Sequence, residues 1–257
     1  EGEENRSLEI PPIGAQWITV LSPKILQLTL ISTKAPDPER VRQWDFIGAN
    51  SARNLPEPEA FETTVDGQNV PVLRVGFKRR VLYAPLLGRD LRIRNDLFLE
   101  LEVAVSDGAT IEINHPTGGL WSKPTPYRTT IDEHRLSPVI HVNQVGYLPS
   151  ESKKAMVGFY LGNLGELEIP AASGFRILEA DTGKEMFQGN LILRPDRGFT
   201  DVPESYQLVW EADFTALDTP GYYRLYVPGV GTSRTFPIAP GVAGSLARTF
   251  ALGLYHQ

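Results

Sequence analysis

The chain has 257 residues, enough for one large domain or two of ordinary size, and its apolar content of 41% allows a buried core. Its formal net charge of −6 is mild and is shared evenly between the two halves, which argues against nucleic acid as a partner. The absence of cysteine excludes disulfides, cysteine-ligated metals and thiol catalysis.

The chain begins with a short polar stretch. Residues 1–9 open with Glu-Gly-Glu-Glu, and we expect them to be a trimmed N-terminal tail without a signal peptide. No apolar run in the sequence approaches membrane-spanning length, so we expect no membrane partner. The cysteine-free composition fits a bacterial exported protein, although a cytosolic protein can also lack cysteine. Of the two, we expect a secreted or periplasmic location.

Residues 10–120 read as a strand-rich segment. Apolar residues partly alternate over 25–31, and a long strand with one dry face follows at 97–105. Asp66-Gly67 separates two further apolar runs, and this dipeptide accepts the positive φ angles of a hairpin turn. These patterns predict a first antiparallel β-sandwich over residues 10–120.

Residues 121–138 contain Pro124, Pro126 and Pro138. Proline at this density interrupts both helices and strand ladders, so we expect an inter-domain linker here.

Residues 139–240 have the length of one immunoglobulin-like unit, with short strands separated by turns. Pro220-Gly221 forms a corner, and Tyr223 follows it at the start of a strand. This placement fits the tyrosine corner of sandwich folds, in which the hydroxyl group binds upstream backbone; a half-buried strand tyrosine fits equally well. The sequence therefore predicts an all-β fold of two tandem antiparallel β-sandwiches.

Residues 241–257 break this pattern and read as a linker followed by a short helix stub. Ser245 is a suitable N-cap, and Leu246, Phe250 and Leu254 then recur at helical spacing with Tyr255 beside them. A helix of this length is marginal in water, and its apolar face needs a partner. We expect it to be the first helix of a missing downstream domain.

The second half of the chain carries an ordered set of motifs. Residues 139–149 read Val-Ile-His-Val-Asn-Gln-Val-Gly-Tyr-Leu-Pro, and Pro-Gly-Tyr-Tyr at 220–223, Phe-Pro-Ile at 236–238 and the helix stub follow. This set resembles the immunoglobulin-like module that precedes the catalytic domain of family 9 glycoside hydrolases, the cellulases. The resemblance covers about residues 139–257, and residues 1–138 lie outside it.

The resemblance implies an accessory role. The parent enzyme would be an inverting β-glycoside hydrolase that acts on β-glucan with paired carboxyl groups, and this chain ends before those motifs occur, so we expect the chain alone to be inactive. Its implied partner is the downstream catalytic domain of the same polypeptide. The expected docking residues are those of the 143–147 motif and of the helix stub: Asn143, Gln144, Tyr147, Leu246, Phe250, Leu254 and Tyr255.

Other chemistry has weaker support in the sequence. The four histidines lack metal-ligand spacing, so we expect no metal site and no cofactor. Trp44 and Trp121 are the candidates for stacking on a sugar ring, although tryptophans of sandwich folds are usually buried.

The only basic cluster is Lys78-Arg79-Arg80, with Arg74, Arg89, Arg92 and Arg94 nearby. It can bind an acidic sugar or a phosphate, or it is the solvent-exposed face of strands whose other face is apolar and buried. Two rival functions remain for the whole chain: a carbohydrate-binding pair of sandwiches, which needs an exposed aromatic platform, and a structural spacer or adhesion module without sugar contact.

Overall fold

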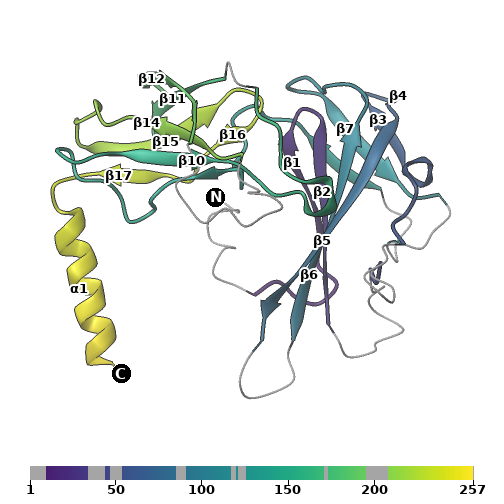
Figure 1. The fold of residues 1–257 in the computed structure, drawn as a ribbon, viewed down its shortest axis with the longest axis horizontal. Helices are drawn as coiled ribbons and strands as arrows, with labels where there is room; N and C mark the ends of the chain where they lie inside the picture. Colours follow the sequence, from purple (N-terminus) through teal and green to yellow (C-terminus); the bar gives the residue numbers. More distant parts are fainter. Residues whose placement is uncertain are drawn as a thin grey trace. The chain divides into compact units, whose positions relative to one another are not determined.

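The computed structural model describes residues 10–33, 44–46, 54–84, 91–116, 120, 126–170, 173–194 and 208–256 (Figure 1). The chain divides into two compact units. The first unit comprises residues 1–131 together with Leu161–Leu164, and the second comprises 132–160 and 165–257. The described residues form four antiparallel sheets and one C-terminal helix, which confirms the predicted all-β tandem-sandwich class.

The first unit contains two four-stranded sheets, ordered β1-β2-β6-β5 and β4-β3-β7-β8 (Figure 1). The strands are β1 (Gln16–Ser22), β2 (Ile25–Ser32), β3 (Glu62–Val65), β4 (Gln68–Asn69), β5 (Val72–Tyr83), β6 (Arg92–Leu101), β7 (Thr110–Asn114) and β8 (Tyr127–Thr130), and a single 3₁₀ turn, η3 (Pro58–Ala60), precedes β3.

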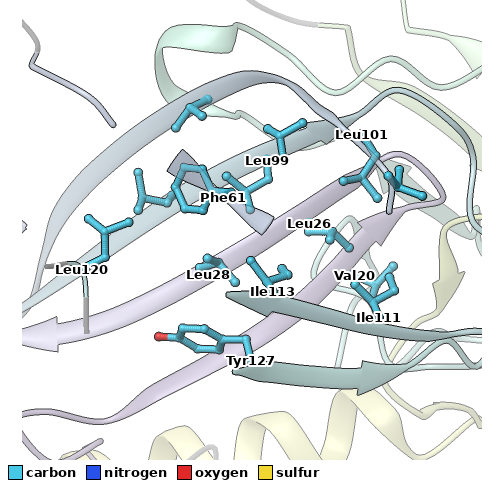
Figure 2. Packing of buried hydrophobic residues seen from close by; sticks show 14 of the residues in the cluster. Val20, Leu26, Leu28, Phe61, Leu99, Leu101, Ile111, Ile113, Leu120 and Tyr127 are labelled. Carbon is cyan, nitrogen blue, oxygen red and sulfur yellow. The ribbon is translucent and has the colours of Figure 1, made fainter. Parts of the chain in front are cut away.

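The core of the first unit lies between these two sheets. Leu26 and Leu28 of β2 face Ile111 and Ile113 of β7, and Tyr127 of β8 closes one side (Figure 2). These side chains alternate along their strands, because successive residues of a strand point to opposite faces of its sheet. The alternation visible in the sequence is therefore what places one face of each strand in the core.

The hairpin predicted around Asp66-Gly67 is confirmed. β3 and β4 pair with Val65 opposite Gln68, and the two turn residues have φ angles of 50° and 80°. The Asp66 carboxylate also accepts a hydrogen bond from the backbone N–H of Thr110 at 2.8 Å, which fastens the turn to β7. The turn chemistry of two residues thus fixes the register of this edge of the sheet.

Two parts of the first unit lie outside the range expected from sequence. β8 falls within the proline-rich stretch that was expected to be a linker, and it pairs with β7. Leu161–Leu164, which contains the 3₁₀ turn η4 (Gly162–Leu164), also belongs to this unit, where it packs on β5. The Asn163 carboxamide oxygen accepts a hydrogen bond from the backbone N–H of Phe77 at 2.6 Å. Because β5 is the last strand of its sheet, this contact covers a main-chain donor that pairing leaves open.

The second unit is a sandwich of a four-stranded sheet, β13-β14-β10-β9, and a five-stranded sheet, β12-β11-β15-β16 with β17 paired to β15. The strands are β9 (Ile140–His141), β10 (Lys154–Val157), β11 (Gly174–Glu179), β12 (Glu185–Asn190), β13 (Ile192–Leu193), β14 (Trp210–Asp213), β15 (Gly221–Val227), β16 (Gly231–Thr232) and β17 (Phe236–Ile238). The helix α1 (Val242–Tyr255) follows β17 (Figure 1).

A tyrosine corner forms at the start of β15. The Tyr223 hydroxyl group donates a hydrogen bond to the backbone oxygen of Thr219 at 3.0 Å, four residues upstream. A Cβ atom on Gly221 would lie 2.8 Å from that hydroxyl oxygen, so the corner needs glycine at this position. Of the two explanations that the sequence left open for Tyr223, the structure supports the corner.

Candidate docking surface

The 143–147 motif forms a tight loop that is anchored by Tyr147. The Tyr147 hydroxyl group accepts a hydrogen bond from the backbone N–H of Asn143 at 2.9 Å and donates one to the backbone oxygen of Lys154 at 2.9 Å. Its ring packs edge-on against Phe214 and Phe236, with centroids 5.1 and 5.3 Å away. Burial raises the pKa of the phenol, and the hydrogen bond from Asn143 partly opposes this. Tyr147 is therefore buried within the second unit, and its hydroxyl group fixes the loop to the backbone of Lys154.

Asn143 shapes the tip of this loop. Its side-chain oxygen accepts a hydrogen bond from the backbone N–H of Val145 at 3.1 Å, and its amide nitrogen donates to the backbone oxygen of Gly146 at 2.9 Å. Asparagine suits such a turn because its side chain reaches backbone two residues ahead. Gln144 and Val145 are left exposed at the tip, and 45% of the Val145 surface is accessible.

The loop lies against β17 and the first turn of α1. The Tyr147 N–H donates to the Pro237 oxygen at 2.9 Å, and the Ala239 N–H donates to the Tyr147 oxygen at 3.0 Å. A Cβ atom on Gly146 would lie 2.6 Å from Pro237 Cγ and 3.0 Å from a methyl carbon of Val242. The loop tip and the beginning of the helix are therefore adjacent. We give the name docking surface to Gln144 and Val145 of the loop together with the Leu246–Phe250–Leu254 stripe of α1.

The helix begins earlier than the sequence suggested. Gly241 occupies the N-cap position, and Ser245 lies inside the helix, where its N–H donates to the Gly241 oxygen at 3.0 Å. The expected Ser245 cap is wrong because the helix gains another turn on its N-terminal side, where Val242 contacts the loop.

Beyond Val242, which contacts the loop, the apolar side chains of α1 are exposed in the described part of the chain. No residue of the helix is buried, and the exposed fractions are 38% for Leu246, 65% for Phe250, 73% for Leu254 and 83% for Tyr255. Leu252 is also exposed and was missed by the sequence analysis. At about 100° per residue it falls on the side of the helix opposite the Leu246–Phe250 stripe, so a search for a single stripe passes over it.

Of the two tryptophans that are candidates for stacking on a sugar ring, Trp44 is described by the structure and is buried. Trp44 is 1% exposed, and its indole N–H donates to the backbone oxygen of Leu120 at 2.5 Å, so its ring is not presented to solvent. Its burial follows from packing beside Phe46, 6.3 Å away between centroids, which the surrounding sequence did not indicate. Trp121 lies outside the described residues.

Within the described ranges, no three histidine or acidic side chains come together in a way that could hold a metal ion. In the same ranges, no helix combines the length and the apolar character needed to cross a membrane.

The second unit is similar in sequence to a domain of known proteins. Residues 135–232 match the family model described as a cellulase N-terminal ig-like domain. Endoglucanase D of Acetivibrio thermocellus is 28% identical over 140 residues, which are 54% of this chain and 19% of that protein. The xyloglucan-specific endo-beta-1,4-glucanase BoGH9A of Bacteroides ovatus is 31% identical over 118 residues, 46% of this chain and 17% of that protein.

A solved structure described as Bacteroides ovatus GH9 is 28% identical to this chain with a TM-score of 0.35, and the match covers 46% of this chain and 19% of that one. The expected resemblance to the N-terminal module of family 9 enzymes is confirmed. The chain spans about a fifth of the length of the curated relatives that it matches, 19% and 17%.

Proposed function

We propose, starting from the cellulase-type ig-like domain at residues 135–232, that this chain is the non-catalytic N-terminal accessory region of a family 9-like glycoside hydrolase that acts on β-glucan. In this proposal the docking surface binds the catalytic domain of the same polypeptide and orients it. The observation that carries the proposal is the exposed apolar face of α1, which begins at Val242, after the matched range 135–232 and β17.

The energetics of the helix support a bound state. Burying a large apolar side chain contributes about 1.5–3 kcal/mol, and Leu246, Phe250, Leu254 and Tyr255 all remain in water here. A lone helix of 14 residues is close to the length at which helices are marginal in water, so its order depends on packing. A partner that covers these side chains therefore stabilises the helix and itself together.

The low charge of the helix supports a partner surface of low polarity. Arg248 is the only Lys, Arg, Asp or Glu residue between 242 and 255, so docking desolvates almost no charge on this side. Val145 and Gln144 extend the surface by one apolar and one amide group, a combination of apolar area and hydrogen-bonding rim that is common at protein interfaces.

Under this proposal the chemistry belongs to the partner domain. Inverting hydrolysis needs a general acid and a general base about 6.5–9.5 Å apart with room for water between them, and these carboxyl groups lie in the catalytic domain. The same proposal places the protein outside the cytoplasm, secreted or periplasmic, where β-glucan is reached.

The proposal is tested by substituting the helix in a polypeptide that also contains the catalytic domain. Phe250→Ser is expected to lower the melting temperature of that polypeptide by several degrees and to leave the 257-residue chain unchanged, because Phe250 has cover only in the former. Ile192→Ser is the control, since this β13 side chain is 63% exposed and lies outside the docking surface. An equal effect of Phe250→Ser in both proteins contradicts docking.

A further inference from the structure

Charged side chains also gather on the face of the β1-β2-β6-β5 sheet opposite the core cluster. This face is itself buried around Gln27, Thr29 and Phe98, and Arg80 of β5 is exposed on it. Lys78 and Arg80 of β5 and Arg94 and Asp96 of β6 lie on this face, because their neighbours Phe77, Leu97 and Leu99 point into the core. Trp17 of β1 shares the face, since it pairs with Thr29, which in turn pairs with Asp96.

The pairing register places like charges opposite one another. Arg80 lies directly across from Arg94, and Lys78 lies across from Asp96. Like charges in directly opposed positions destabilise a sheet, so the Arg80–Arg94 pair breaks a local rule of sheet stability. Burial and the charges of Arg80 and Arg94 lower the pKa of Lys78, while Asp96 raises it. The three cations thus repel one another, and the Asp96 carboxylate lies across from Lys78 and binds Arg94.

Arg94 is held in a fixed orientation. Its Nε atom donates to both carboxylate oxygens of Asp96, at 2.9 and 3.0 Å, and the Thr29 hydroxyl group donates to the same carboxylate at 2.6 Å. The guanidinium carbon lies 5.6 Å from the centroid of the Trp17 ring. Among the described residues, the two terminal nitrogens of Arg94 form no hydrogen bond. The guanidinium group is therefore held in place while its terminal N–H donors have no acceptor in this part of the chain.

The other arginines of the sequence cluster that the structure describes have partners, and Arg89 lies outside the described residues. Arg74 forms an ion pair with Glu100. Arg79 points to the core side, where it binds Asn95 at 2.7 Å and Asp45 at 3.0 Å. Arg92 donates to the backbone oxygens of Ile10 and Pro11 at 3.1 and 2.6 Å. The sequence cluster therefore divides into structural arginines and a smaller set, Lys78, Arg80 and Arg94 with Trp17, which we call the basic patch.

We infer that the basic patch binds a carboxylate-bearing saccharide, a chain that contains uronic acid residues. The carboxylate group would accept hydrogen bonds from the terminal nitrogens of Arg94 and from Arg80, which relieves the repulsion between them, and Lys78 adds a third positive charge. The indole of Trp17 offers apolar area to the C–H groups of the sugar ring. The mild negative charge of the whole chain disfavours a nucleic-acid polymer as the ligand.

The test is calorimetric titration of the 257-residue chain with a xylo-oligosaccharide that carries one glucuronic acid and with the neutral oligosaccharide of equal length. We expect the acidic ligand to bind at least tenfold more tightly, and Arg94→Gln and Arg80→Gln each to weaken it about tenfold. Arg128→Gln is the matched control, because Arg128 is an exposed arginine of β8 that pairs with Glu112 at 3.2 Å in the other sheet.

Four outcomes overturn the inference. They are equal affinity for the acidic and neutral sugars, equal weakening by Arg128→Gln, binding of inorganic phosphate as tight as that of the acidic sugar, and tighter binding of single-stranded DNA. Arg80→Lys keeps the charge of this exposed side chain but loses the fork, and it is expected to retain part of the affinity and the melting temperature of the parent chain. A loss of affinity in Arg94→Gln counts only if its melting temperature is also preserved; otherwise the Arg80 variants decide.

Discussion

Replacing Gly162 by alanine tests the contact between η4 and the edge strand β5. Gly162 has a φ angle of 65°, and a Cβ atom there would lie 2.1 Å from the backbone oxygen of Phe77 and 2.7 Å from its carbonyl carbon. Non-bonded heavy atoms do not approach so closely, so Gly162→Ala must displace the segment from β5. The neighbouring hydrogen bond from the Phe77 N–H to Asn163 is then lost, and Leu164 leaves its place on Gly76.

The magnitude follows from these losses. The left-handed conformation costs a non-glycine residue about 1–2 kcal/mol, and an unpaired buried backbone N–H costs about 1–3 kcal/mol. We therefore expect a loss of about 3 kcal/mol, or roughly 10 °C in the melting temperature of a unit of this size. Gly165→Ala is the matched control: its φ angle is 82°, but a Cβ atom meets nothing within 4 Å, so it should lose only about 1 kcal/mol.

The assay is urea unfolding of both variants, with amide hydrogen exchange of Phe77 by NMR as the local measurement. We expect fast exchange at Phe77 in Gly162→Ala and protection close to that of the parent chain in Gly165→Ala. Equal destabilisation by the two substitutions, or an unchanged Phe77 amide in Gly162→Ala, would refute the assignment of η4 to the edge of β5.

Two further predictions concern tyrosines. Tyr223→Phe removes the corner hydrogen bond to Thr219 and should lower the free energy of unfolding, measured in urea, by about 1 kcal/mol. Tyr222→Phe is the control, because Tyr222 is 63% exposed and its change should leave this free energy the same. Equal losses in the two variants would show that the corner bond is unimportant. Burial raises the pKa of Tyr127 and Tyr147 above the ordinary value of about 10. The folded state therefore holds these two protons more tightly than the unfolded state does. As a result, the free energy of unfolding should fall as the pH rises above about 10. The double variant Tyr127→Phe, Tyr147→Phe should show a shallower fall between about pH 10 and 11 in urea unfolding, and an unchanged slope would contradict this origin of the pH dependence.

Features that depend on local chemistry were predictable from sequence. The Asp66-Gly67 turn is set by two residues that tolerate positive φ. For Tyr223 the sequence indicated a corner and a half-buried strand tyrosine equally, and the structure shows the corner. The fold class follows from the alternation of apolar residues, because one face of each strand must be buried. In each case the information lies within a few residues of the feature.

Features that depend on distant contacts were not predictable. The burial of Trp44 is set by partners such as Leu120, 76 residues away, and the orientation of Arg94 is set by a carboxylate that Thr29 holds from another strand. The addition of Leu161–Leu164 to the first unit depends on the shape of β5 at Gly76 and Phe77. For the helix, the Ser245 cap signal was overridden by an additional turn that starts at Val242.

Amide hydrogen exchange of residues 242–256 tests the docking proposal most directly. It is measured on the dilute 257-residue chain and on a polypeptide that also contains the catalytic domain. We predict fast exchange in the first and at least hundredfold slower exchange in the second, because the side chains of α1 are exposed in the chain alone. Strong protection in the dilute monomer, or no gain of protection in the longer polypeptide, would contradict the account.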